Sequence, residues 1–177
     1  TPGTPLRSLL DAILAAAKHS ADLVKQLLGF ASKQVISPRR LNLNEAISDV
    51  YDMLARLLGS SVSLEWLPGA NIWPVMMDPN QVDQILVTLT VNARDAMSGV
   101  KKITIKTNNV SQHKISTASQ DNTSFCDYVQ LSFSDDGCGM DAQTQANIFE
   151  PFFSSKVQGA GTGIGLAMVY GIVKQNN

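Results

Sequence analysis

The sequence predicts an α+β domain in which helices cover a sheet, with one long helix before the domain. The length of 177 residues suits a single α/β domain with an appendage. Several long segments have apolar residues at helical spacing, and segments of alternating apolar and polar residues lie between them. The composition, 44% hydrophobic and 16% charged, is that of a globular protein. We expect residues 1–36 to form the long helix and residues 37–177 the domain.

The predicted N-terminal helix has one narrow apolar stripe. Thr4 and Pro5 supply a cap and a first-turn proline. The segment SPRR at 37–40 ends the helix. The stripe has coiled-coil-like spacing and consists of Leu10, Ile13, Leu14, Ala17, Ala21, Val24, Leu28 and Ala31. A stripe of this kind favours packing against a second helix.

Two longer helices are predicted in the first half of the domain. The segment 42–60 begins with Asn42 and has Glu45 three residues later, which is a capping box. Pro79 begins the next helix, which extends to about residue 97. Its apolar face consists of Val82, Ile85, Leu86, Leu89, Ala93, Ala96 and Met97.

Two helices are expected near the end of the chain. A short one covers residues 141–148. The last lies within residues 161–175, and its predicted inner face consists of Leu166, Val169, Tyr170 and Val173. A sandwich of this type normally continues with further strands, so we expect a closing pair of strands to be missing from this sequence.

Four segments are predicted as strands because they alternate or follow a turn. These are 62–66, 72–78, 101–108 and 127–135. The polar segment 109–125 between the last two has no period, and we expect a loose hairpin tip there.

Charge and composition exclude several classes of function. A formal net charge of −1 gives no basic field for nucleic acid. No apolar run is long enough to span a bilayer, and the N-terminus lacks the pattern of a signal peptide. Cys126 and Cys138 are too few for a disulfide framework or a zinc site. We expect a cytoplasmic, reduced protein whose membrane anchor, if it has one, lies outside this chain.

The first candidate binding segment is TLTVNARDAM, within the helix that begins at Pro79. Helical spacing places Thr88, Asn92 and Asp95 along one edge of the apolar face and Arg94 on the other edge. An amide oxygen at Asn92 is a suitable ligand for Mg²⁺, which prefers oxygen ligands. The alternative is that Asn92 is only a polar residue beside a core face.

The second candidate segment, FSDDGCGMD, follows the last predicted strand. Asp135 or Asp136 could accept a hydrogen bond from an amino group, and Gly137 and Gly139 would allow a flat ring to approach. The alternative is an ordinary turn from strand to helix, in which aspartate and glycine serve local geometry.

The third candidate segment, GAGTGIGLAMV, leads into the last helix. Gly161, Gly163 and Gly165 place free backbone N–H groups and the positive helix end together, which is the outline of a phosphate site. No strand precedes these glycines, so a dinucleotide-binding fold is excluded. No Lys-Ser or Lys-Thr follows them, so a P-loop is excluded too.

Taken together and in this order, the motifs resemble the Bergerat-fold nucleotide-binding domain. This domain is shared by sensor histidine kinases, gyrase, mismatch-repair ATPases and the heat-shock chaperone. The four boxes are TLTVNARDAM, DDGCGM, FEPFF and GTGIGL. The sequences of these boxes are most similar to those of the nitrogen-regulatory type of sensor histidine kinase. The resemblance covers about residue 17 to the end. It implies a two-layer α/β sandwich, with a mixed sheet covered by helices, that binds ATP with Mg²⁺.

The resemblance also implies a role for individual residues. Asp135 would bind the adenine amino group, and Asn92 would hold Mg²⁺ against the phosphates. It further implies a short lid over residues 154–160, in which Lys156 would contact phosphate, with a merely solvated lysine as the alternative. The full set of ATP-binding residues that it implies is Asn92, Asp95, Asp135, Gly137, Gly139, Phe149, Phe152, Phe153, Lys156, Gly161, Thr162, Gly163, Gly165 and Leu166.

Thr88 departs from the family pattern. Sensor kinases usually have asparagine at this position, so we expect weakened but not abolished metal binding. The relatives that hydrolyse ATP have a glutamate there as general base, and a threonine hydroxyl does not deprotonate at neutral pH. This difference favours transfer of a phosphoryl group to a protein over hydrolysis.

The phosphoacceptor histidine of the family is also absent. Neither His19 nor His113 has the family's surrounding residues, and AAAKHSADLVKQLLGFASKQ resembles the second helix of the dimerisation hairpin. The resemblance therefore implies the catalytic part of a sensor histidine kinase, which transfers the γ-phosphoryl group of ATP to a histidine on a helix outside this chain. It also implies a response-regulator receiver domain as partner and a homodimer formed by hairpin helices in the full-length protein. The alternatives are a degenerate, non-catalytic nucleotide-binding module and a gyrase-like ATPase.

Overall fold

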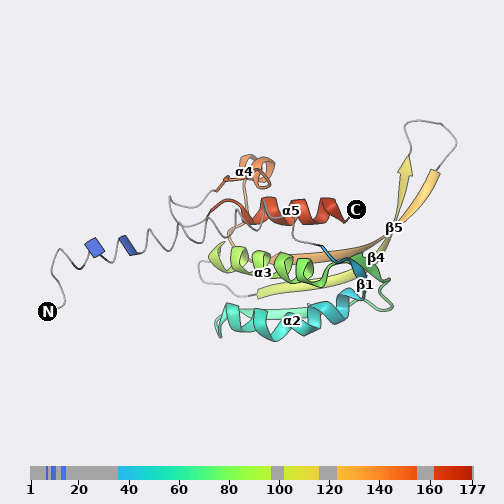
Figure 1. The fold of residues 1–177 in the computed structure, drawn as a ribbon, viewed down its shortest axis with the longest axis horizontal. Helices are drawn as coiled ribbons and strands as arrows, with labels where there is room; N and C mark the ends of the chain where they lie inside the picture. The colour runs from blue at the N-terminus through green and yellow to red at the C-terminus, as the bar shows by residue number, and fades with distance from the viewer. Residues whose placement is uncertain are drawn as a thin grey trace.

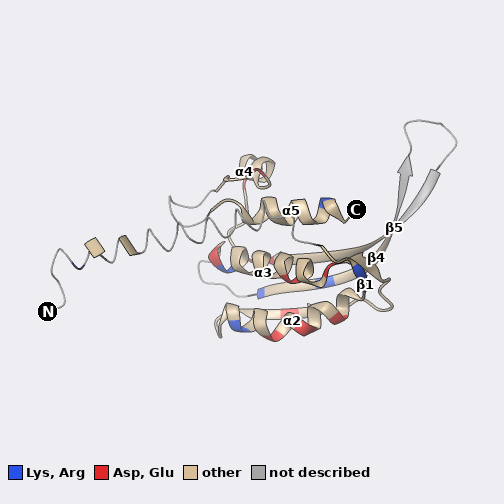
Figure 2. Ribbon diagram, in the orientation of Figure 1, with Lys and Arg blue, Asp and Glu red and all other residues tan. Residues whose placement is uncertain are grey.

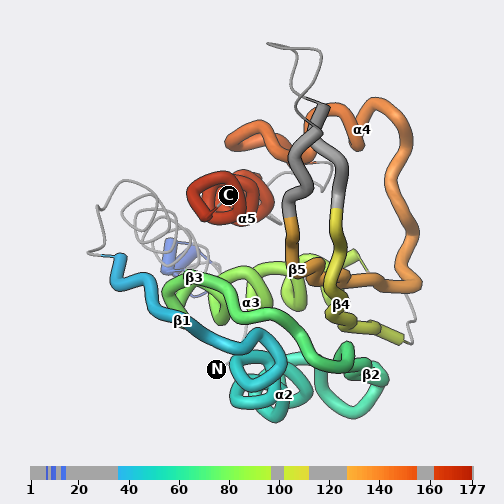
Figure 3. Tube along the Cα trace, turned by 90° about the vertical axis from the view of Figure 1, so that its right-hand side faces the viewer, coloured from blue at the N-terminus to red at the C-terminus, as the bar shows by residue number. Residues whose placement is uncertain are grey.

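The computed structural model describes residues 36–96, 102–115, 123–154 and 162–176, and five residues nearer the N-terminus. In this part of the chain, α2 (Leu43–Leu58), α3 (Pro79–Ala96) and α5 (Gly165–Gln175) lie on one side of a mixed sheet (Figures 1 and 3). The short α4 (Ala142–Asn147) lies beyond β5. The predicted fold class, helices layered on a mixed sheet, is confirmed.

The main sheet has the strand order β2-β4-β5. β2 (Ser63–Leu67) is parallel to β4 (Lys102–Ile115), and β4 is antiparallel to β5 (Thr123–Asp135). The face toward the helices includes the fully buried Ile103 and Ile105. On the opposite face, Lys102 Nζ lies 3.0 Å from Glu65 Oε2, and this contact is the main cause that lowers the pKa of Glu65. Alternation of apolar and polar residues along β4 thus separates a core face from a polar face.

The hairpin formed by β4 and β5 is longer than predicted. The strands continue through part of the polar segment 109–125 and stay paired as far as Ile115 opposite Thr123. Backbone hydrogen bonds hold the ladder whatever the side chains are, so a polar, aperiodic sequence does not end it. Ser111 and Asp127 are opposite each other, and their side chains are hydrogen-bonded at 2.6 Å.

A second, two-stranded sheet joins β1 (Arg39–Leu41) to β3 (Val75–Met77) in antiparallel register. The sequence predicted β3 within a longer segment but did not predict β1, which has three residues and no alternation to detect. Directly after β1, the Asn42 side chain caps α2 by accepting a hydrogen bond from the Asn44 N–H, and it donates to Glu45. The predicted capping residues are therefore in place.

The core lies between the helices and the sheet. Ile47 and Leu54 of α2 and Leu86 of α3 are fully buried there, together with Ile103 and Ile105. Burial of such aliphatic side chains contributes roughly 1.5–3 kcal/mol each, which fixes α3 on the sheet. The position of α3 matters because it carries the first candidate binding segment.

The predicted inner face of the last helix is wrong in two positions. Ala167, Val169 and Ile172 are buried, whereas Tyr170 and Val173 are 44% and 45% exposed. Helix α5 approaches α3 through small and aliphatic side chains, and the larger tyrosine ring remains at the rim.

Most of the predicted N-terminal helix lies outside the described residues. Arg7, Leu9, Leu10, Ile13 and Leu14 have helical backbone, and the four apolar side chains among them are exposed. No helix in the described part of the chain is both long and apolar enough to cross a membrane.

Candidate functional site

Helix α5 begins directly against the C-terminal half of α3. A Cβ atom added to Gly165 would lie 3.0 Å from Thr88 Cγ2 and 3.6 Å from Asn92 Nδ2. Only glycine allows the α5 backbone to approach these two side chains so closely. The GTGIGL segment and the helix that carries Asn92 therefore lie in contact, as the sequence predicted.

The start of α5 is suited to an anion. It has no side-chain cap and no acidic residue in its first turn. The first N–H groups of a helix have no partner within the helix, and they carry its partial positive charge. An anionic group placed beside Gly165 would receive these donors while lying next to Asn92.

Asn92 is half-buried and makes no hydrogen bond within the described part of the chain. Its amide oxygen is a hard donor of the kind that Mg²⁺ accepts, and Thr88 supplies a hydroxyl one turn away. No group of three or more His, Cys, Asp or Glu residues among the described residues is placed to hold a metal ion. The donor set therefore fits a Mg²⁺ ion that takes most of its ligands from phosphate and water.

The two adjacent aspartates after β5 have different environments. Asp136 Oδ1 accepts a hydrogen bond of 2.9 Å from the Lys102 N–H, and so closes the end of the sheet. Asp135 Oδ1 accepts from the Gly137 N–H at 2.9 Å, and Asp135 is exposed. Among the described residues, Asp135 Oδ2 has no partner. Asp136 is exposed too, and its Oδ2 likewise has no partner among the described residues, so Asp135 as the ligand-binding aspartate stays a prediction.

The Gly-x-Gly turn lies close to the end of α3. A Cβ atom on Gly137 would lie 2.7 Å from Asp135 Oδ1 and 3.5 Å from the Ala96 carbonyl oxygen. Gly139 has a φ of +69°, and no atom lies within 4 Å of its Cβ position. The turn is thus closely packed at Gly137, beside Asp135 and the last turn of α3, and open at Gly139.

The two ends of the segment predicted as a lid are held together. The Phe152 N–H donates to the Gly163 carbonyl oxygen at 2.9 Å. Both residues have positive φ, +70° for Phe152 and +66° for Gly163. A Cβ on Gly163 would overlap the Phe152 carbonyl group and lie 2.7 Å from the Phe153 oxygen, so glycine is required there. Lys156 and Gly161 lie outside the described residues.

Aromatic residues attach the FEPFF segment to α5. Phe149 stacks on Tyr170 with ring centroids 5.1 Å apart, and Lys174 Nζ lies 5.5 Å from the Tyr170 centroid. Phe153 is half-buried, whereas Phe152 is 63% exposed. The sequence did not indicate Tyr170 as a partner of Phe149, because its spacing suggested a core residue.

The other predicted site residues differ in how they are engaged. Thr162 and Leu166 are half-buried at the start of α5. Asp95 is exposed and forms an ion pair with Arg94 at 3.1 Å. Arg94 was predicted on the other edge of the apolar face, and its long side chain reaches the Asp95 carboxylate. The positive φ of Phe152 was also missed, since non-glycine residues rarely adopt it and give no signal in sequence.

Comparison with known proteins adds a family and relatives. Residues 77–177 match the family described as histidine kinase-, DNA gyrase B-, and HSP90-like ATPase. The chain is 42% identical over 159 residues to the sensor kinase CckA of Brucella abortus (strain 2308), which covers 90% of this chain and 17% of CckA. It is 26% identical over 166 residues to the signal transduction histidine-protein kinase AtoS of Escherichia coli (strain K12), which covers 93% of this chain and 24% of AtoS. The chain thus spans less than a quarter of either relative.

Two solved structures share the fold. Full-length ShkA in complex with AMPPNP has a TM-score of 0.64 at 20% identity, over 98% of this chain and 35% of that chain. The mycobacterial sensor histidine kinase MprB has a TM-score of 0.61 at 19% identity, over 79% and 80%. At these identities the likeness concerns the fold alone, and it agrees with the predicted sandwich.

The family match contains the whole candidate site. It begins at Met77, at the end of β3, and includes α3, β4, β5 and α5. Asn92, Asp135 and Gly165 all lie within it. The two relatives, which match nine-tenths of this chain, are sensor kinases. The chain belongs to the histidine kinase-, DNA gyrase B-, and HSP90-like ATPase family, as its motifs predicted.

Proposed function

We propose that this chain binds Mg-ATP at the C-terminal end of α3 and forms the catalytic part of a two-component sensor histidine kinase. The observation that carries the proposal is the contact of Gly165 with Thr88 and Asn92, which brings an uncapped helix start to an unused amide. Asp135, with one free carboxylate oxygen near the same helix end, supplies the second point of recognition.

The proposed roles follow from the chemistry of each group. Asp135 Oδ2 accepts a hydrogen bond from the adenine amino group, and Gly139 leaves room for the ring. Asn92 holds Mg²⁺, which would neutralise phosphate charge and orient the phosphates. The N–H groups at the start of α5 bind phosphate oxygens, and the joined Phe152 and Gly163 fix the ends of the lid segment.

The proposed reaction is phosphoryl transfer to a histidine on a helix outside this chain. A nitrogen of the imidazole forms a bond to the γ-phosphorus, the bond from that phosphorus to the bridging oxygen breaks, and ADP leaves. The imidazole proton passes to solvent. Such transfer needs positioning and charge neutralisation rather than a general base on α3. Thr88 is therefore compatible with transfer and unsuited to activating water.

Calorimetric titration with ADP and ATP, with and without Mg²⁺, tests the nucleotide site. We expect saturable binding by the wild-type chain, and Asp135→Ala should weaken it roughly 10- to 100-fold, since a hydrogen bond to a charged group contributes about 1.5–3 kcal/mol. Asp52→Ala, on the exposed face of α2, is the matched control and should bind as the wild type does. A folded wild-type chain that takes up no nucleotide would refute the proposal.

One observation favours a second function. The atom of Thr88 nearest to Gly165 is its methyl carbon. The asparagine that sensor kinases usually have at this position would offer an amide to assist the metal, and threonine has none. A non-catalytic nucleotide-binding module would tolerate this. Supplying a hairpin with an acceptor histidine and radiolabelled ATP distinguishes the two: labelled histidine supports the kinase, and nucleotide binding without label supports the module.

The proposed partners come from the relatives. The solved complex of histidine kinase ThkA with the response regulator protein TrrA has a TM-score of 0.56 and 23% identity to this chain. By analogy, we propose a response-regulator receiver domain as partner and a homodimer through hairpin helices in the full-length protein. Use of ATP places this part of the protein in the cytoplasm.

A further inference from the structure

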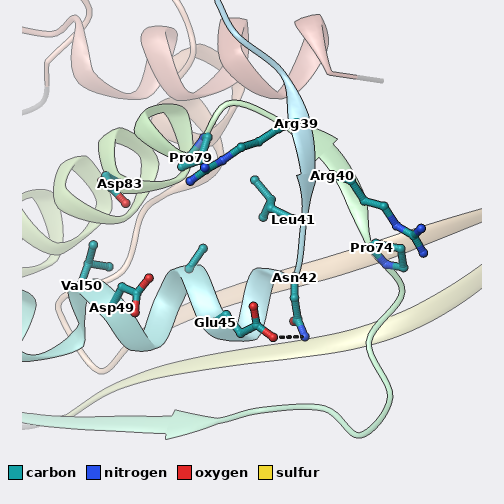
Figure 4. A pocket seen from close by; sticks show the side chains of 11 residues that line it. Arg39, Arg40, Leu41, Asn42, Glu45, Asp49, Val50, Pro74, Pro79 and Asp83 are labelled. Atoms are coloured by element: carbon teal, nitrogen blue, oxygen red, sulfur yellow. Dashed lines mark hydrogen bonds between the residues drawn. The ribbon is translucent and has the colours of Figure 1, made fainter.

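A cavity of about 510 Å³ lies between β1 and the beginnings of α2 and α3 (Figure 4). It is distant from the candidate nucleotide site, because Asp83 and Asn92 are nine residues, or about 14 Å, apart along α3. Its lining combines apolar and charged side chains, among them Arg39, Leu41, Asp49, Val50, Pro79 and Asp83.

Residues 37–41, which we call the strap, pass along this cavity. The Ser37 N–H donates to Asp78 Oδ2 at 2.9 Å and fixes the beginning of the strap. The remaining backbone pairs only with the three residues of β3 among the described strands. The strap is therefore held by Ser37 at its beginning, by β3 along one edge, and at its end by Leu41, which packs against the core directly before the Asn42 cap.

Opposite charges face this cavity without pairing. Arg39 reaches from β1 toward Pro79, and Asp49 and Asp83 project from α2 and α3. Within the described part of the chain, none of these three side chains has a hydrogen bond or an ion pair. Figure 2 shows acidic residues on the ribbons of both α2 and α3.

The present position of Arg39 gives it little stabilisation. Its charge helps to lower the pKa of Asp78, but as the smallest of several causes. Asp78 already accepts three hydrogen bonds, from the Ser37 N–H and from the backbone and side chain of Asn80. Loss of the Arg39 charge would therefore leave all three hydrogen bonds of Asp78 in place.

Asp83 has the opposite environment. Burial raises the pKa of Asp83, and the negative charges of Asp49 and Asp78 raise it further. The other charged groups at the cavity offer no relief, because Glu45 accepts a hydrogen bond from Asn42 and Arg40 points away toward Pro74. Alternation along β1 places Arg39 and Leu41 on one side of the strand and Arg40 on the other.

We propose that the strap closes on α2 and α3, so that Arg39 pairs with Asp83 and Asp49 across the cavity. The structure then represents the open position. In the closed position the guanidinium group would satisfy two carboxylates that now have no partner among the described residues. Because the strap joins residues 1–36 to the domain, closure would change how the preceding segment enters it.

The pKa of the Asp83 carboxyl, measured by carbon-13 NMR on the whole chain, tests this proposal. A closed strap brings a positive charge to Asp83, so its pKa should lie below the ordinary value of 3.8. Arg39→Gln should then raise it by about one unit or more, because an opposite charge at contact distance lowers a carboxyl pKa by roughly 1–3 units. Arg39→Lys should restore part of the lowering.

Arg40→Gln is the matched control, since it removes the same charge from the other side of the same strand. It should leave the Asp83 pKa within a few tenths of a unit of the wild-type value. An Asp83 pKa above 3.8 in the wild type that Arg39→Gln does not change would overturn the proposal. A response to Arg40→Gln equal to that of Arg39→Gln would overturn it too. Arg39 and Arg40 are both exposed, so neither substitution threatens the fold.

Discussion

The two ends of helix α3 carry similar amide side chains that are used in different ways. At the beginning, buried Gln81 donates to Gln175 Oε1 at 3.2 Å and accepts from Asn176 Nδ2 at 3.0 Å. At the other end, Asn92 is half-buried beside Gly165 and has no such bond within the described residues. This difference supports the proposal that the first end of α3 serves stability and the other end serves a ligand.

The largest expected effect separates these two ends. Asn92→Ala removes the proposed metal ligand, so the affinity for Mg-ATP should fall roughly 100-fold, by analogy with the cost of disturbing metal sites. The melting temperature should hardly change, because Asn92 makes no internal hydrogen bond. Calorimetry and thermal unfolding of the same sample measure both quantities.

Gln81→Ala is the reciprocal control. It leaves Gln175 and Asn176 without their partner, so it should destabilise the fold by about 1–3 kcal/mol while nucleotide affinity stays near the wild-type value. If Asn92→Ala lowered stability as much as Gln81→Ala does, the two ends of α3 would not differ in the way proposed.

A second test concerns the segment ends joined at Gly163. Gly163→Ala should weaken nucleotide binding by about 30-fold, because a Cβ there overlaps the carbonyl groups of Phe152 and Phe153 and the backbone must move. Gly59→Ala, at the C-terminal end of α2 and outside the candidate site, is the matched control. Its φ is also positive, but nothing lies within 4 Å of the added atom, so only backbone strain is introduced. Equal losses for both variants would mean that strain alone, and not the Phe152 contact, matters.

Much of this comparison could be predicted from the sequence, and the exceptions have physical reasons. The boxes that place Asn92, Asp135 and Gly165 together are local patterns with fixed residue types, so the sequence shows them. Strand β1 has three residues and depends on pairing with β3, which lies 34 residues later. Because β1 forms only through this tertiary contact, no local sequence pattern predicts it.

The rim of α5 was mispredicted for a related reason. Periodicity counts Tyr170 and Val173 as apolar and assigns them to the core. The structure instead uses the tyrosine ring to stack on Phe149, a contact between residues 21 positions apart. Amphipathic side chains of this kind are often placed at the edge of a core, where the ring is covered and its polar end reaches water.

A third test examines the contact between the two helices at the ligand end. Gly165→Ala should weaken nucleotide binding about tenfold, because the new methyl group would lie only 3.0 Å from Thr88 Cγ2 and push α5 away from Asn92. Adding Thr88→Ser removes that methyl carbon and keeps the hydroxyl. The double variant should recover most of the affinity. Failure of this rescue would show that the spacing of α3 and α5 at Gly165 does not control binding.

The smallest expected effect concerns acid stability at the beginning of α3. The Ser37 N–H, followed by the Asn80 N–H, lowers the pKa of Asp78 below its ordinary value of 3.8. A carboxyl group whose pKa is lower in the folded state stabilises the fold above its unfolded pKa, and this contribution disappears as the pH falls through the folded pKa. Asp78→Asn presents an N–H to one of these donors and removes the titration. The difference in unfolding free energy between the wild type and Asp78→Asn should therefore be larger at pH 7 than at pH 3, as measured by urea unfolding. Nucleotide affinity at pH 7 should be unchanged, because Asp78 lies at the end of α3 that the ligand does not use. A difference in stability that is the same at both pH values would mean that the Asp78 charge is not what holds Ser37.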